Sequence, residues 1–130
     1  IKRRKLNHIP SSGESSEEIS RASVVAKKGV ILGGDLNIIR LNSKFSSVFV
    51  AITLSNGSQQ KELSKRAQGK SVVHLHNSDL KEVNLFYPTL PEQIAIGSFF
   101  QELDQLITLQ QRELEILKTM KSALLKAMFA

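Results

Sequence analysis

The feature that most constrains the fold is a seven-residue repeat of apolar residues in the last third of the chain. From Ile96 to Met128 the spacing alternates between four and three residues, which predicts one long helix with a coiled-coil seam. Over residues 92–128 this helix would be ~55 Å long, because each residue of an α-helix adds about 1.5 Å. Since a helix of that length cannot bury its apolar stripe against a small body, we expect it to pack against another helix.

The seam contains two polar positions, Gln110 and Lys121. In coiled coils such residues fix the register and orientation of the helices at some cost in stability; alternatively, both lie near solvent where the seam opens. The full seam is Ile96, Phe100, Leu103, Ile107, Gln110, Leu114, Leu117, Lys121, Leu124 and Met128. A second set of apolar residues widens the stripe, so we expect more than one partner surface. This set is Phe99, Leu106, Leu109, Ile116, Met120 and Leu125.

A capping box marks the start of this helix. The Thr89 oxygen is expected to accept a hydrogen bond from a backbone N–H of the first turn, while the Glu92 carboxylate accepts one from the Thr89 N–H. Pro91 lies in the first turn, where its missing N–H costs little. The sequence therefore predicts two parts, a first domain of residues 1–90 and a helical part of residues 91–130.

The first domain is predicted to be small and mixed, so the fold class is α/β (α+β) followed by a long C-terminal coiled-coil helix. Residues 1–23 hold a basic run and then serines and acids without periodicity, so we expect a flexible start outside the core. Residues 45–54 are either a strand or a buried helix. Short strands are predicted at residues 24–25, 30–32, 36–41, 71–76 and 83–87.

One further helix is predicted at residues 59–68, with Ser58 as its N-cap and Gly69 as its C′ residue. Residues 77–79 are predicted to form a turn or a cap. With few aromatic side chains, this first domain has a thin core.

The positive charge belongs to the first domain. Residues 1–91 hold 14 Lys and Arg against 7 Asp and Glu, whereas residues 92–130 hold 4 against 5. A basic body joined to a nearly neutral helix indicates a polyanion as one partner and a protein as the other. The alternative is a soluble protein that is merely basic.

The basic residues of the body are candidates for DNA contacts, because lysines bind phosphates while arginine and glutamine can bind base edges with two hydrogen bonds. The densest group is at residues 65–71. Residues 2–5 form another basic run, either a phosphate-binding arm or a solvated charge run; charged helix ends are also common on inert surfaces. The candidate DNA-binding residues are Lys27, Lys28, Arg40, Lys44, Lys65, Arg66, Gln68, Lys70 and Ser71.

No catalytic or cofactor site is predicted. His74 and His76 would share one face of a strand, but no third metal ligand is evident, so a structural or DNA-facing role is favoured over a metal site. Nucleophile elbows, phosphate loops and dinucleotide fingerprints are missing from the sequence. The chain has no cysteine, which fits a reducing cytoplasm, and no apolar run long enough to span a membrane. We therefore expect a non-catalytic cytoplasmic protein without cofactors.

The helix and the residues before it carry a recognisable motif. Its first part is Pro88, Leu90, Glu92, Gln93, Ile96, Phe100, Leu103, Asp104 and Ile107. Its end is Leu117, Lys121, Leu124, Leu125, Met128 and Phe129. This motif resembles the conserved region of type I restriction-modification specificity (S) subunits. Upstream, Ala67, Gly69, Ser71, Asp79 and Leu80 resemble the end of a target recognition domain. The strong likeness covers residues 85–129; residues 56–84 match loosely and 1–44 hardly at all.

This resemblance implies a target recognition domain, partial here, that reads one half of a split DNA sequence, and a spacer helix that positions methyltransferase (M) and restriction (R) subunits. It implies double-stranded DNA as a partner, basic loops before Pro88 that face DNA, and pairing of the helix with the second half of the subunit or with its own copy. The alternatives are a coiled-coil assembly module, or the specificity end of a fused restriction-methylation enzyme. The residues implied to pack the spacer are Ile96, Phe100, Leu103, Ile107, Leu114, Leu117 and Leu124.

Overall fold

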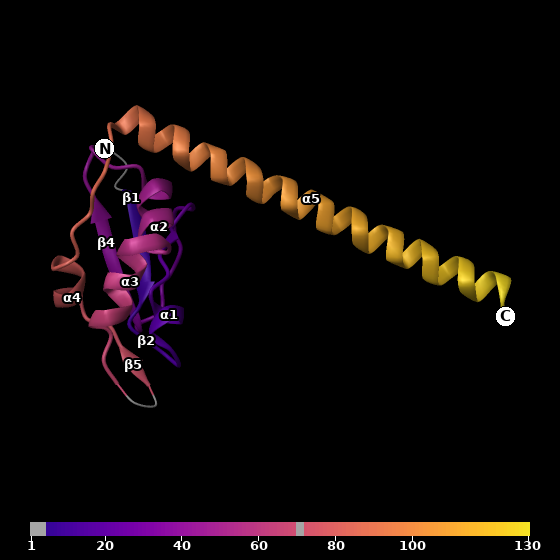
Figure 1. Ribbon diagram of the computed structural model, residues 1–130, viewed down its shortest axis with the longest axis horizontal. Coiled ribbons are helices and arrows are strands. Elements are labelled where there is room, and N and C mark those ends of the chain that lie inside the picture. The colour runs from indigo at the N-terminus through magenta and orange to yellow at the C-terminus, as the bar shows by residue number, and fades with distance from the viewer. Residues whose placement is uncertain (1–4, 70–71) are drawn as a thin grey trace. The chain divides into compact units, whose positions relative to one another are not determined.

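A small three-stranded sheet and a long C-terminal helix organise the chain (Figure 1). The computed structural model describes residues 5–69 and 72–130. The chain divides into two units, Ile1–Gly97 and Ser98–Ala130. The mixed α and β fold class with a long final helix is confirmed. In chain order the elements are β1 (Lys5–Pro10), β2 (Ser12–Gly13), α1 (Ser16–Ile19), β3 (Ser23–Val24), β4 (Leu36–Leu41), α2 (Ser47–Leu54), α3 (Gly57–Arg66), β5 (Val73–His74), α4 (Asn77–Lys81) and α5 (Leu90–Met128).

The three-stranded sheet has the order β3-β1-β4, and both pairings are antiparallel. Asn7 pairs with Ile39 and Ile9 pairs with Asn37, so these four side chains share one face. Asn7, Ile9 and Asn37 are buried, which makes this the core face. A second, two-stranded sheet joins β2 to β5.

The expectation that residues 1–23 lie outside the core is wrong for the part that the structure describes. β1 is the central strand, and the side chains of Ile9 and Ile19 are 0% and 1% exposed. The serines that lack periodicity instead organise α1, because the Ser15 side chain accepts from Glu18 N and caps the helix. The core is formed by Ile9, Ile19, Phe49, Val50, Leu54, Leu63, Val73 and Leu75.

The ambiguous segment at residues 45–54 contains a helix, α2. Ser46 is its N-cap, and its side chain accepts from Phe49 N. Phe49, Val50 and Leu54 are buried in the core. The helix forms although its β-branched residues favour a strand, because tertiary burial outweighs the weak intrinsic propensity.

Several local predictions are wrong. Residues 30–32 and 83–87 lie in no strand or helix; of the predicted strand at 71–76, residue 71 lies outside the described residues, and only 73–74 of residues 72–76 are in a strand. Helix α3 has its N-cap at Asn56 rather than Ser58, and it ends at Arg66 with Ala67 extended, so Gly69 is not its C′ residue. Gly69 instead has φ +147°, and an added Cβ would collide with the carbonyl of Val72.

The predictions of a strand over residues 36–41 and of a cap near residues 77–79 are confirmed. β4 is Leu36–Leu41. At the start of α4, Asp79 Oδ2 accepts from His76 N at 2.8 Å, and this closes a capping box. This bond fixes the turn from β5 into α4.

Only one of the two hydrogen bonds predicted for the capping box at the start of α5 is present. Glu92 Oε2 accepts from Thr89 N at 3.0 Å, as the sequence predicts. The Thr89 hydroxyl, however, donates to the same carboxylate oxygen at 2.5 Å and does not accept from the first turn. These two hydrogen bonds stabilise the charged form and hold the pKa of Glu92 below its ordinary value, with the hydroxyl bond as the larger cause.

This geometry predicts an effect of Thr89→Val on the pKa of Glu92. Because the folded-state pKa is depressed, the contribution of this group to stability is present above the ordinary pKa of 4.5 and is lost as the pH falls through the lower folded value. Removing the hydroxyl should therefore raise the pKa of Glu92 part of the way back, since the backbone bond remains. A carboxyl-carbon NMR titration of both proteins measures this, and an unchanged pKa would contradict the assignment.

Candidate nucleic-acid interface

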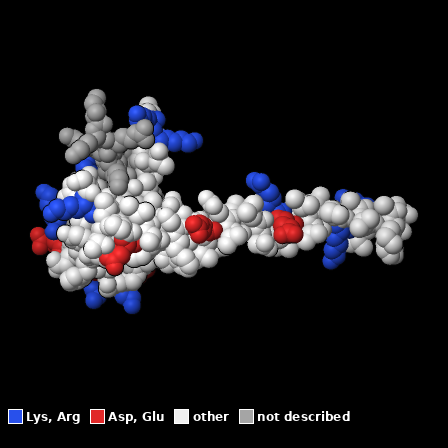
Figure 2. All heavy atoms as spheres, turned by 90° about the horizontal axis from the view of Figure 1, so that it is seen from above, with Lys and Arg blue, Asp and Glu red and all other residues white. Residues whose placement is uncertain are grey.

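The predicted DNA-binding residues lie on separate elements of the body. Lys27 and Lys28 lie between β3 and β4, Lys44 follows β4, and Lys65 is in the last turn of α3; all four are exposed. On the face drawn in Figure 2, the blue side chains of the body are spread out and do not form one patch. Lys70 and Ser71 lie outside the described residues. The structure therefore places these lysines in solvent, where phosphates can reach them, but does not bring them together on one surface.

Arg66 has a structural role within the body. Its Nη2 donates to Glu62 Oε1 at 3.1 Å and to the carbonyl oxygen of Glu82 at 3.3 Å. The first bond spans one turn of α3, and the second ties the end of α3 to the residue after α4. Because Nη2 is already used in this way, a two-bond contact to a base that includes Nη2 would require breaking these bonds, whereas the N–H groups of Nη1 take no part in them.

Three exposed polar side chains lie together at the second sheet. Gln68 forms an antiparallel bridge with His74 through backbone hydrogen bonds of 3.0 Å and 2.8 Å, so their side chains share a face. The rings of His74 and His76 are stacked, with centroids 6.3 Å apart and planes 6° apart. The prediction that the two histidines share one face is confirmed. Hydrogen-bonding groups of this kind suit base edges.

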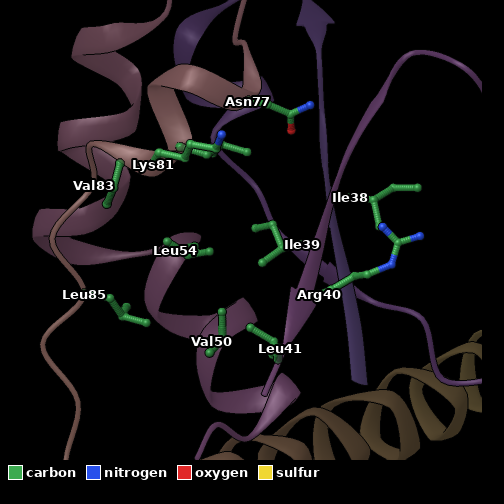
Figure 3. Close-up of a pocket in the computed structure, with 11 residues that line it drawn as sticks. Ile38, Ile39, Arg40, Leu41, Val50, Leu54, Asn77, Lys81, Val83 and Leu85 are labelled. Carbon is green, nitrogen blue, oxygen red and sulfur yellow. The ribbon is translucent and has the colours of Figure 1, made fainter. Parts of the chain in front are cut away.

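A cavity of about 540 Å³ opens between β4, α2, α4 and the segment that follows α4 (Figure 3). Most of its lining is aliphatic, with Ile39 and Leu41 from β4 and Val50 and Leu54 from α2. Arg40 is the one predicted DNA-binding residue in the lining. The lining has no Asp, Glu, His, Ser or Thr, so it offers no pair of groups for acid–base or nucleophilic catalysis.

Lys81 also lines this cavity, and sequence analysis did not select it. As an isolated lysine outside any basic run, it carries no local signal. The structure places Lys81 and Arg40 around one cavity although 41 positions separate them in the chain. Figure 3 shows that the Arg40 side chain points to the opposite side of β4 from Ile39 and Leu41, so the two cations are not gathered into one charged site.

The described residues hold no group of three His, Asp or Glu side chains that could bind a metal ion. Nor does any helix within residues 5–69 and 72–130 combine the length and the apolar character needed to cross a membrane.

The apolar seam of α5 is open to solvent. Within α5 only Gln93 and Gly97 are buried, and both belong to the first unit. The seven residues implied to pack the spacer are between 37% and 58% exposed. A regular apolar stripe left in water over such a length favours a partner outside this chain.

A comparison with protein families shows to which family the chain belongs. The model of the type I restriction modification DNA specificity domain matches residues 16–119. The chain belongs to this family. Comparison with curated proteins and with solved structures gave no match.

The family match covers more of the body than the sequence resemblance suggested. It begins at residue 16 and so includes β3, β4 and α1, where almost no likeness was expected. It also ends at residue 119, before the last residues for which a likeness was expected. The DNA specificity domain thus spans both units, and its function is DNA sequence recognition in a type I restriction-modification system.

Proposed function

We propose that this chain is the non-catalytic specificity component of a cytoplasmic type I restriction-modification complex and reads one half of a bipartite DNA site. The observation that carries the proposal is the combination, within one family match, of a basic body and a helix whose apolar seam is unpartnered. On this proposal the body binds DNA, and α5 holds the body at a set distance from a second DNA recognition domain. Catalysis and cofactors belong to the partner subunits.

Phosphate contacts would position the body on DNA and side chains on the second sheet would read bases. Lys27, Lys28, Lys44 and Lys65 are exposed and can bind phosphates, as proposed from the sequence. Gln68 remains the candidate reader, and the stacked His74 beside it adds donors and acceptors for base edges.

The width of the apolar stripe on α5 supports two protein partners. The seam, in which Ile96, Leu103, Leu117 and Leu124 lie at multiples of seven residues from one another, suits one antiparallel helix, from a second copy or from the other half of the subunit. Phe99, Leu106, Leu109, Ile116 and Met120 form a neighbouring stripe, and each is between 54% and 57% exposed. We assign this second stripe to the methyltransferase subunit.

A salt series with matched lysine variants tests DNA binding. For the intact complex on a labelled duplex, Lys27→Gln combined with Lys28→Gln should reduce the slope of log K against log salt by about 0.9 for each lost phosphate contact. Lys118→Gln combined with Lys126→Gln on α5 removes the same charge from the spacer helix and should leave the slope unchanged. No binding at low salt, or equal slopes for both pairs, would overturn this part of the proposal.

The second candidate is a coiled-coil assembly module whose basic body is incidental, which the open seam alone would also fit. It predicts that charge reversal at Lys65 and Lys44 leaves both self-association and cellular restriction unchanged. A fused restriction-methylation enzyme is distinguished by the mass of the native polypeptide, which would be far larger than one specificity subunit.

A further inference from the structure

Gln93 is a fully buried polar residue in the first turn of α5, and its side chain joins three backbone segments. Its Oε1 accepts from Ser46 N at 3.0 Å. Its Nε2 donates to the carbonyl of Lys44 at 3.1 Å and to the carbonyl of Pro88 at 3.0 Å. One amide thus connects the loop after β4, the approach to the helix and the helix itself.

The chemistry of this position selects glutamine. The site presents one backbone donor and two backbone acceptors, and a carboxamide supplies one acceptor oxygen and two N–H donors. A glutamate would lose both donors and bring a buried charge, and an apolar side chain would leave three backbone groups without a partner. Of the two orientations of the amide, only the observed one matches all three groups.

Gly97, one helical turn beyond Gln93, is the other buried residue of α5. A Cβ at this position would lie 3.1 Å from Val48 Cγ1 and 3.3 Å from Val48 Cβ, so glycine allows the helix to approach α2 closely. Ser46, which donates to Gln93, is also the N-cap of α2. The first turns of α2 and α5 are therefore held together by one hydrogen-bonding side chain and one close contact.

The loop that Gln93 holds also carries Lys44, an exposed candidate for phosphate binding. The loop is folded locally as well, since Lys44 N donates to Asn42 Oδ1 at 2.9 Å and the ring of Phe45 packs against Tyr87 with centroids 4.6 Å apart. Movement at Gln93 would therefore shift a DNA-facing loop and the helix start relative to each other.

We propose that Gln93 is a positioning residue that couples the DNA-facing loop at residues 42–46 to the spacer helix and thereby fixes the distance between the two DNA half-sites. This inference rests on the proposed function. Gln93 itself has no path to DNA because its side chain is 0% exposed. Its effect is on geometry: one base pair displaces a half-site by about 3.4 Å, and a displacement of about 1 Å can already cost roughly 100-fold in rate.

The functional test measures spacing selectivity with Gln93→Met and, as a matched control, Gln105→Met, which makes the same change at an exposed position of α5 away from the seam. Intact complexes methylate a library in which the two half-sites are separated by the native spacing or by one base pair more or fewer. Wild type and Gln105→Met should strongly prefer the native spacing. Gln93→Met should lower that preference by up to about 100-fold while keeping the half-site sequences, because a misplacement of about 1 Å can cost that much in rate.

A purely structural loss of folded protein would lower methylation at all spacings by the same factor, so an unchanged spacing ratio overturns the inference. If wild type itself shows no sequence-selective methylation, the proposed function fails instead. Gln93→Glu is the second variant; it keeps the acceptor for Ser46 N and should relax spacing in the same direction.

A measurement without DNA keeps the inference testable if the variant complexes do not assemble. The chain has no cysteine, so Ser43→Cys and Arg112→Cys provide two unique spin-label sites, one in the loop and one on α5. In this chain the distance distribution between the labels should be narrow with Gln93 and broader with Gln93→Met. Equal widths would show that Gln93 does not hold the junction.

Discussion

Replacing Leu114 with Asp should abolish pairing of the spacer helix. Leu114 lies in the middle of the seam and is 51% exposed in the single chain, so its remaining surface is available to a partner helix. Aspartate there would lose the apolar contact and place a charge in the helix interface without a partner. We expect a loss of at least about 3 kcal/mol in association free energy, or roughly a 100-fold weaker complex. Light scattering of the purified chain over a concentration series measures this.

Two further variants test which partner binds each apolar stripe of α5. Gln105→Asp places the same charge on the side of α5 away from the seam and should leave association unchanged. Leu109→Asp places it on the second apolar stripe and should leave helix pairing intact but weaken binding of the methyltransferase subunit. The same oligomer for wild type and Leu114→Asp would show that the seam is assigned to the wrong residues.

Replacing Ile19 with Ala should destabilise the body by about 2–5 kcal/mol, the usual range for a large core side chain reduced to alanine. Ile19 is 1% exposed and packs within the cluster that includes Leu63 and Val73. The cavity left by alanine should cost this much free energy because α1 is short and held by its own hydrogen bonds. The helix therefore cannot move freely to fill the space. Urea unfolding followed by fluorescence of the only tyrosine, Tyr87, reports on the body separately from the rest of α5.

Ile31→Ala is the matched control, because Ile31 is 96% exposed and the same side-chain reduction removes almost no buried surface. Its effect should stay within about 0.5 kcal/mol. If both variants unfold at the same urea concentration, then α1 is not part of the cooperative core. That outcome would support the flexible start that the sequence suggests.

Sequence reasoning was most successful where structure depends on near neighbours. The strand at β4 and the cap near Asp79 were predicted, because alternation and turn residues act over a few positions. The same rules failed for residues 83–87, which alternate like a strand but form no strand in the structure. Alternation reports burial of every second side chain, and a strand also requires a neighbouring backbone to bond.

For the candidate DNA-binding residues, too, part of the information lies in the sequence and part only in the fold. Residue type identifies lysines that can bind phosphate, but their grouping depends on the fold. Arg66 was selected for its charge, yet Glu62 and the carbonyl of Glu82 occupy its Nη2. Lys81 was overlooked, yet it shares a cavity with Arg40. Gln93 was noticed only as part of a family motif, and its role required its three partners to be located.

The sequence by itself determined the long helix α5 and its start near Thr89, and it predicts the residues of its seam. Backbone bonds in a helix span four residues and the seam repeats every seven, so all of that information is local. The tertiary structure decided how the body is built and how it holds the helix. Gln93 binds Ser46 and Lys44 from 47 and 49 positions away, and Ile19 joins a core that closes around Leu63 and Leu75. Such contacts depend on how distant segments pack, and no local pattern in the chain specifies that packing.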